Sequence, residues 1–274
     1  MSILKSFVRN WCPPIIRKMI QPKSFLHVHF PSECTSWSAA ELMCSGYDSP
    51  EIVNKVLGTT IKVLNGEFAY ERDSVGFLKA EYSWPVLCGL LLAASTNENH
   101  LSVLDFGGGL GSSFFQNRRF LAALSSVNWS VVEQSAFVNA GNEKVKFKGL
   151  HFYNSINECV LVCQPNAILL SSVLQYINNY QIVIDQITKI AAEFIIIDRT
   201  PFLKNGSIEK IFTQKVPDWI YQASYPCRFF VESDFIKIFE SKGYFLLESF
   251  DSFDDLDNRA KWGGYIFRRT NSKV

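Results

Sequence analysis

The chain has 274 residues, of which 47% are hydrophobic and 14% aromatic, and its formal net charge is +1. This composition excludes a disordered chain and predicts one large domain with an elaboration, or two small ones, around a core rich in aromatic rings. The nearly balanced charge gives no indication of nucleic-acid binding, and no nucleic-acid partner is expected.

Residues 1–35 are predicted to form a basic N-terminal arm. Its basic side chains are Lys5, Arg9, Arg17, Lys18 and Lys23, and residues 1–30 contain no acid. Packing on the domain is favoured over peripheral contact with an anionic membrane, because Pro13 and Pro14 interrupt any long helix. No signal peptide and no transmembrane helix are expected, so we expect a cytoplasmic protein, at most peripheral at the inner face of the membrane.

Residues 36–98 are predicted to form a helical extension that acts as a lid. Residues 36–64 have helical periodicity around a break at Gly46–Pro50, and 81–95 form a second, apolar helix. The charged stretch YERDS, residues 70–74, is most simply the solvated start of a helix. The alternative hypothesis is that Tyr70, Glu71, Arg72 or Asp73 folds over a ligand pocket as part of the lid, with Tyr70, Arg72 and Asp73 as candidate contacts to substrate.

Residues 99–274 show short apolar runs that alternate with helical stretches. Strands are predicted at 101–106, 129–133, 150–153, 167–172 and 193–200, and helices at 112–124, 134–143, 179–192 and 233–243. This alternation indicates a parallel sheet covered on both faces. Residues 244–252 and 263–270 have no helix between them, which predicts an antiparallel hairpin at the edge of the sheet.

The stretch LSVLDFGGGLGSS, residues 101–113, places a glycine-rich turn after the first of these strands. Ligands of α/β sheets bind at the carboxyl ends of strands, so a ligand is expected here. The lysine of the P-loop pattern GxxxxGK[ST] is absent, and Ser112 occupies the last position of the dinucleotide pattern GxGxxG. The pattern Asp105-x-Gly107-x-Gly109-x-Gly111 is complete. Its glycines allow close approach of a ligand, and Asp105 either orders the loop or meets an ammonium group.

Glu133 ends the second predicted strand. A carboxylate at that position can accept hydrogen bonds from both hydroxyl groups of a ribose. The alternative is a solvent-facing acid that suits the dipole of the following helix. The strand is otherwise apolar and its acid is terminal, so the ribose role is favoured.

The glycine turn resembles the nucleotide-binding turn of class I S-adenosylmethionine-dependent methyltransferases. SSVLQYINNY, after the fourth strand, and the closing hairpin are also similar to stretches of these enzymes. More narrowly, the chain resembles a group of predicted methyltransferases encoded among bacterial surface-polysaccharide and O-antigen genes. The matching stretches are SWSAAELMCSGYD, YERDSVGF, VLDFGGGLGSSFF, WSVVEQ, SSVLQYI, IIIDRTPF, VPDWIYQASYP and GGYIFRR, which span residues 36–268.

This resemblance implies a Rossmann-like α/β methyltransferase fold with a mostly parallel seven-stranded sheet and a C-terminal antiparallel hairpin. It implies S-adenosyl-L-methionine as cofactor and a small-molecule or glycan acceptor in polysaccharide biosynthesis, with O-methylation favoured. A nicotinamide-dependent oxidoreductase is the alternative, although the chain lacks a Tyr-x-x-x-Lys pair. A catalytically degenerate binding protein with the methyltransferase fold is the third possibility.

The implied roles fall on the ends of the strands. The cofactor residues are Asp105, Gly107, Gly108, Gly109, Gly111, Glu133, Asn154, Ser155, Ser171 and Ser172. For Asn154 and Ser155 a simple turn is an equal alternative. The candidates for catalysis are Asp198, Arg199 and Tyr176, where a buried ion pair that braces the loop is the alternative for the first two. The aromatic segment 216–230 supplies Tyr221, Tyr225 and Arg228, which contact the acceptor or simply pack in the core.

The seven cysteines are scattered, odd in number and without a CxxC pair. This pattern argues against a disulfide framework and against a zinc site. Reduced thiols and no bound metal are expected.

Overall fold

The computed structural model describes residues 28–46, 50–252, 254 and 257–270. The five basic residues of the predicted N-terminal arm, and with them the predicted membrane contact, lie outside these residues. Within the described part of the chain, no helix is both long enough and apolar enough to cross a membrane.

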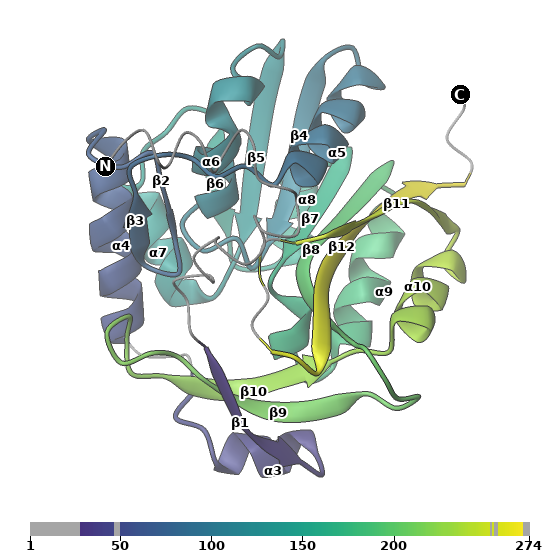
Figure 1. The fold of residues 1–274 in the computed structure, drawn as a ribbon. Helices are drawn as coiled ribbons and strands as arrows, with labels where there is room; N and C mark the ends of the chain where they lie inside the picture. The colour runs from purple at the N-terminus through teal and green to yellow at the C-terminus, as the bar shows by residue number, and fades with distance from the viewer. Residues whose placement is uncertain (1–27, 47–49, 253, 255–256, 271–274) are drawn as a thin grey trace, which may run out of the picture.

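A seven-stranded sheet forms the centre of the molecule, and its order is β11-β12-β8-β7-β4-β5-β6 (Figure 1). Neighbours from β6 to β8 run parallel, whereas β12 is antiparallel to both β8 and β11. The prediction of a mostly parallel sheet that closes with an antiparallel hairpin is confirmed. The strands are β4 (His100–Phe106), β5 (Ser126–Val132), β6 (Leu150–Tyr153), β7 (Ala167–Ser171), β8 (Phe194–Leu203), β11 (Tyr244–Asp251) and β12 (Ala260–Arg269).

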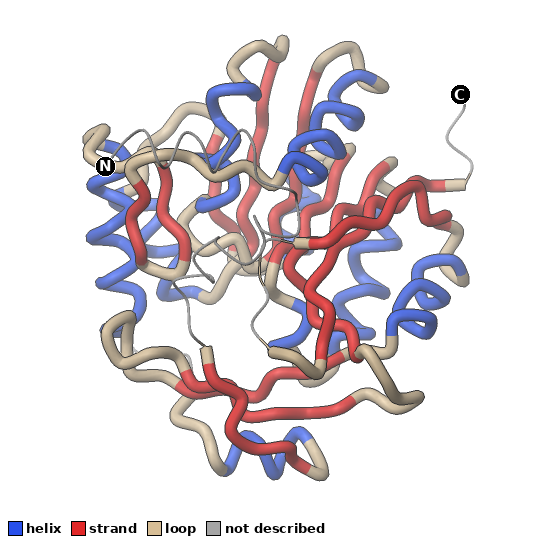
Figure 2. The backbone as a smooth tube through the Cα atoms, in the orientation of Figure 1, coloured by secondary structure: helices blue, strands red, loops and turns tan. Residues whose placement is uncertain are grey.

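Helices lie against both faces of this sheet, because its central strands are apolar on both sides (Figure 2). In β8, Ile196 packs into one core while Ile195 and Ile197 pack into the other. Val103 and Leu104 of β4 divide in the same way. The first core includes α4 (Pro50–Leu64), α5 (Trp84–Ser95), α6 (Ser112–Leu121) and α7 (Ser135–Lys144). The second includes α8 (Ile156–Val162), η1 (Leu174–Tyr176), α9 (Tyr180–Ile190) and α10 (Glu232–Glu240).

A hairpin of β2 (Tyr70–Arg72) and β3 (Val75–Phe77) interrupts the N-terminal region that was predicted to be helical. The predicted solvated helix start at residues 70–74 is therefore wrong. Asp73 and Ser74 form a two-residue turn with φ values of 52° and 66°, which suits a tight hairpin. The rings of Tyr70 and Phe77 stack across the pair at 4.9 Å. The other helical predictions for this region are confirmed by α3 (Trp37–Leu42), α4 and α5.

A second, three-stranded sheet lies below the main sheet in Figure 1 and was not predicted. Its antiparallel order is β1-β9-β10, from β1 (His29–Cys34), β9 (Lys210–Lys215) and β10 (Ser224–Phe229). Phe30, Phe212 and Phe229 form a small core with Trp262 of β12. This core fixes the second sheet against the last strand of the main sheet, and residues 216–225 then line the site described next.

Candidate functional site

A cavity of about 510 Å³ opens at the carboxyl ends of β4, β5 and β7. Strand order reverses beside β4, and this is the place where α/β sheets bind ligands. The volume lies within the range of small-molecule sites. The cavity brings together most of the residues that the sequence indicated, namely Arg72, Asp73, Asp105, Gly107, Gly108, Gly109, Glu133, Asn154, Ser171, Ser172, Tyr176, Arg199, Tyr221 and Tyr225.

The glycine turn forms one wall of the cavity, and its conformation requires glycine. Gly107 and Gly109 have φ values of 74° and 58°, in the left-handed region that side chains disfavour. A Cβ atom on Gly107 would lie 2.4 Å from Val173, and one on Gly108 would lie 2.4 Å from the carboxylate of Asp105. Gly111 lies outside the lining and is the N-cap of α6.

The side chain of Asp105 holds this turn in place. Its carboxylate accepts a hydrogen bond from Nε1 of Trp129 at 2.9 Å and lies against Gly108. Burial raises the pKa of Asp105 to about 7, since desolvation disfavours the charged form. Of the two roles predicted for Asp105, the structure shows the contacts of the first, the ordering of the loop.

Glu133 follows β5 and lies at the next position along the cavity wall. The backbone N–H of Gln134 donates to its carboxylate at 2.6 Å. Burial raises the pKa of Glu133, while backbone N–H groups of Gln134 and Gly109 oppose the shift. Asn154 lines the cavity after β6, but Ser155 does not; its hydroxyl caps α8 by accepting from the N–H of Glu158 at 3.1 Å.

An uncommon backbone conformation occurs just after β7 and within β8, directly beyond the last residue pair that joins these two strands. Ser172 and Arg199 have φ values of 56° and 51°. The fully buried Gln175 joins these two residues, donating from Nε2 to Oγ of Ser172 at 3.2 Å and to the carbonyl of Arg199 at 3.1 Å. Non-glycine residues in this conformation persist only where the surroundings hold them, and they cluster at functional sites.

Asp198 lies behind the cavity rather than in its lining. The side chain is 6% exposed and accepts a hydrogen bond from Oγ of Ser171 at 3.2 Å. Burial raises its pKa to about 6. Among the three candidates for catalysis, Arg199 and Tyr176 line the cavity and Asp198 supports Ser171 from outside it.

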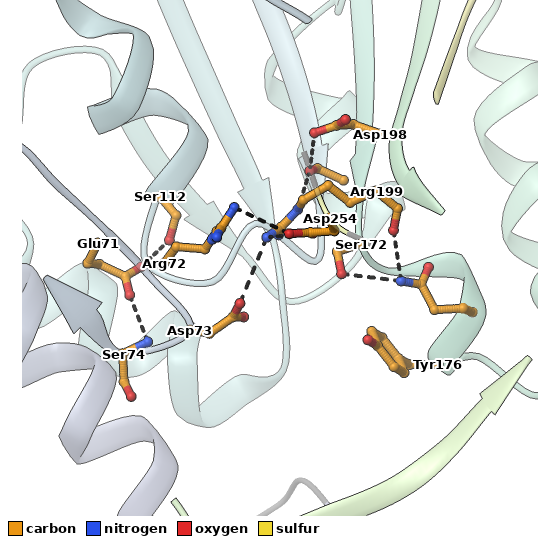
Figure 3. Close-up of polar contacts among 12 residues, drawn as sticks. Glu71, Arg72, Asp73, Ser74, Ser112, Ser172, Tyr176, Asp198, Arg199 and Asp254 are labelled. Carbon is orange, nitrogen blue, oxygen red and sulfur yellow. Dashed lines mark hydrogen bonds and ion pairs between the residues drawn. The ribbon is translucent and has the colours of Figure 1, made fainter. Parts of the chain in front are cut away.

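Two arginines and two aspartates form a loose charged cluster at the cavity (Figure 3). Arg199 lies 3.8 Å from Asp73 and 4.0 Å from Asp254, and Arg72 lies 3.7 Å from Asp254. These four residues come from the hairpin, the middle of β8 and the connection between β11 and β12, so the tertiary fold alone assembles them. Asp254 had no signal in the sequence.

Glu71 belongs to the YERDS stretch, and the sequence did not commit it to a contact with cofactor or substrate. Its side chain reaches the start of α6, where its carboxylate accepts hydrogen bonds from Oγ of Ser112 and from the N–H of Ser74 (Figure 3). Burial raises its pKa to about 7. A run of charged residues is usually exposed to solvent, so the pattern YERDS predicted an exposed Glu71 and not a buried one.

An aromatic and amide wall closes the other side of the cavity. Oη of Tyr176 donates to Gln214 at 3.1 Å, and Nε2 of Gln214 donates to Oη of Tyr225 at 3.3 Å. Tyr221 lines the same side. Burial raises the pKa of Tyr176 well above its ordinary value, so its phenol stays protonated and serves as a donor.

Two predicted substrate contacts lie elsewhere. Tyr70 is buried in the main core, and Arg228 forms an ion pair with Glu209 at 2.9 Å. Neither belongs to the cavity lining. Among the residues that the structure describes, no group of three or more His, Cys, Asp or Glu side chains is placed to hold a metal ion.

No protein-family model matches the chain, and no curated protein matches its sequence. Solved structures with a similar fold include the N-terminal domain of EvdMO1 in the presence of SAH and D-fucose, with 11% identity, a TM-score of 0.49 and coverage of 81% of this chain and 97% of that one. An S-adenosylmethionine-dependent methyltransferase from Clostridium acetobutylicum ATCC 824 has 12% identity, a TM-score of 0.45 and coverage of 79% and 98%.

A pericyclic reaction enzyme is also similar, with 13% identity and a TM-score of 0.46. The match covers 66% of this chain and 46% of that enzyme, so the chain spans about half of its length. Likenesses this distant leave the activity of this chain to be inferred from its own residues.

Proposed function

We propose that the protein is an S-adenosylmethionine-dependent methyltransferase that acts on a glycan or glycan precursor. The observation that carries this proposal is the placement of the glycine turn and Glu133 on one wall of a single cavity. Gly107–Gly109, in the turn that Asp105 orders, would hold the methionine and ribose part, Glu133 the ribose hydroxyls, and Asn154 the adenine. When bound, S-adenosylmethionine supplies an electrophilic methyl group on a sulfonium centre.

The residues of this cavity fit that cofactor better than a nicotinamide dinucleotide. Five carboxylates line the cavity, those of Glu71, Asp73, Asp105, Glu133 and Asp254, but its only basic lining residues within the described chain are Arg72 and Arg199. Both arginines already form ion pairs with aspartates. An acidic wall suits a sulfonium cation and disfavours the two charges of a pyrophosphate.

The acceptor side of the cavity suits a sugar. Nε of Arg72 and Oδ1 of Asp254 are buried without a hydrogen-bond partner among the described residues, one a donor and the other an acceptor. A sugar hydroxyl both donates and accepts, so it can satisfy either atom. The wall of Tyr176, Tyr221 and Tyr225 offers rings for the apolar face of a sugar.

Positioning is the main contribution of the chain to a methyl transfer. Gln175 joins Ser172 to Arg199, so this part of the lining is held in place where the acceptor would meet the methyl group. A hydroxyl acceptor also requires a group that takes its proton. Asp73 supplies this group in the proposal, because its side chain is 47% exposed and lines the cavity.

Calorimetry with three ligands tests the cofactor. We expect the wild-type chain to bind S-adenosylmethionine and S-adenosylhomocysteine but not NAD. Glu133→Ala should weaken S-adenosylhomocysteine binding about 10- to 100-fold, since hydrogen bonds to a charged acceptor are lost. Glu143→Ala, an exposed acid on α7, is the matched control and should leave binding unchanged. Binding of NAD alone would refute the proposal.

Transfer of a labelled methyl group tests the acceptor. Isolated polysaccharide precursors and simple sugars are incubated with labelled S-adenosylmethionine and the chain. Appearance of the label on a sugar oxygen supports a glycan acceptor and O-methylation. If the label is found only on a different class of small molecule, the proposal of a methyltransferase stands and the proposal of a glycan acceptor is refuted.

A further inference from the structure

The side chain of Glu71 joins the N-terminal hairpin to the glycine turn. It is 2% exposed, and one carboxylate oxygen accepts from the N–H of Ser74 at 3.1 Å while the other accepts from Oγ of Ser112. Ser112 is the first residue of α6, directly after the turn that Gly107–Gly111 forms. Figure 3 shows Glu71 between these two serines, at the end of the polar cluster away from Tyr176.

This carboxylate is buried without a cation of its own. Both of its donors are neutral, and among the described residues Glu71 forms no ion pair within 4.0 Å. Arg199 attracts it only at longer range and is itself paired with Asp73 and Asp254. A buried carboxylate that lacks a cation is costly, and Glu71 lines the cavity, where a ligand can supply one.

Asp105 is the other acid near the turn, and its carboxylate packs within the turn itself. Trp129 donates to its carboxylate, and Gly108 packs directly against the same group. These contacts fix the carboxylate of Asp105 beneath the backbone of Gly108. Glu71 reaches the same turn from the β2–β3 hairpin, 41 positions from Ser112 in the sequence.

We propose that Glu71 binds the α-ammonium group of the methionine part of S-adenosylmethionine. The inference rests on the proposed function and adds a cofactor contact from outside the sheet. The ammonium group would donate to the carboxylate as a charge-assisted hydrogen bond. The β2–β3 hairpin would thereby act as the part of the fold that recognises the amino-acid end of the cofactor.

Binding of an ammonium group favours the ionised form of Glu71. Because burial raises the pKa of the free carboxyl to about 7, ligand binding near pH 7 should release part of a proton. The charged and titratable groups that face Glu71 are Asp73, Arg199 and Tyr221. Asp105, in the same cavity, also titrates near pH 7, so the proton released is compared between the wild type and a Glu71 variant.

A pair of ligands tests the contact with the amino-acid end of the cofactor, where a carboxylate such as Glu71 can attract only the ammonium group. S-Adenosylhomocysteine carries the amino-acid group, and 5′-methylthioadenosine has the same nucleoside and sulfur without it. Both are titrated into the full chain with Glu71→Gln and with the control Glu67→Gln, whose residue is exposed just before the hairpin. We expect Glu71→Gln to weaken S-adenosylhomocysteine about 10- to 100-fold, as for a charge-assisted hydrogen bond, and to leave 5′-methylthioadenosine within about two-fold.

The preference between the two ligands decides the inference. Partial unfolding of a variant lowers both apparent affinities together and leaves their ratio unchanged. An unchanged ratio in Glu71→Gln overturns the inference, even if turnover falls. If Glu71→Gln does not fold, Glu71→Asp takes its place: the shorter side chain keeps its charge but withdraws from the ammonium group, so its preference for S-adenosylhomocysteine over 5′-methylthioadenosine should fall. A wild-type chain that binds neither ligand refutes the proposed function instead.

Discussion

Replacement of Gly107 by alanine tests whether the glycine turn is held by backbone conformation and by contact with Val173 together. The φ of Gly107 is 74°, and an L-residue in this region costs about 1–2 kcal/mol. The new Cβ atom would also lie 2.4 Å from Cγ2 of Val173, so that side chain must move. Overpacking of this kind costs about 1–3 kcal/mol. We therefore expect the free energy of unfolding to fall by about 2–5 kcal/mol.

Gly66→Ala separates the two contributions. Gly66 has a φ of 80°, but a Cβ atom there would meet nothing within 4 Å. It should lose only the conformational part, about 1–2 kcal/mol. Adding Val173→Ala to the Gly107→Ala chain should restore the free energy of unfolding that the contact with Val173 costs. Adding it to the Gly66→Ala chain should restore nothing. In both cases the effect of Val173→Ala in the wild type is subtracted.

Urea unfolding of the wild type and the five variants measures these differences as shifts in the midpoint at constant slope. Equal losses in Gly107→Ala and Gly66→Ala would show that Val173 does not press on the turn. A loss in Gly107→Ala that Val173→Ala leaves untouched would lead to the same conclusion. Either result would refute the explanation of the turn by close contact.

Stability of the ligand-free protein should decrease as the pH rises. The pKa values of Glu71 and Asp105 are raised to about 7 and that of Asp198 to about 6, so the folded chain binds more protons than the unfolded chain above about pH 4. The stabilisation from these three groups is complete below that pH and is lost as the pH rises through 6 to 7. The midpoint of urea unfolding, measured from pH 4 to pH 8, should therefore fall. A midpoint that rises over this range would contradict the prediction. Gln175→Ala removes the hydrogen bonds to Ser172 and to Arg199, so we expect the free energy of unfolding to fall by about 1–3 kcal/mol. The same variant should lower kcat more than it lowers the affinity for S-adenosylhomocysteine, because these two residues are no longer held in place. Gln222→Ala, an exposed amide, is its control in urea unfolding and methyl-transfer kinetics, and an equal effect of both would contradict the positioning role.

The main sheet could be predicted from the sequence because each pattern that indicates it depends on residues close together in the chain. The apolar runs around Val103 and Ile196 must be buried on both faces, and helical stretches between them supply the cover. Gly107, Gly109 and Gly111 all have positive φ values, so their backbone conformation explains the glycine pattern. These features predicted the place in the sheet at which a ligand is expected to bind.

Burial of charge could not be predicted in the same way. YERDS suggests a solvated segment, and only the folded chain shows Glu71 covered and bonded to Ser112, 41 positions away. Asp254 joins Arg72 and Arg199 for the same reason, across three separate parts of the chain. Strand β1 pairs with β9, where Lys210 and Glu33 meet across 177 positions.

The sequence by itself determined the parallel sheet, its closing hairpin and the glycine turn, because apolar periodicity and glycine conformation act over a few residues. The tertiary structure alone decided which acids line the cavity and which lie behind it. Hydrogen-bond donors such as Ser112 and Gln175 come from distant segments, and whether a carboxylate is exposed or buried depends on them rather than on its neighbours in the chain.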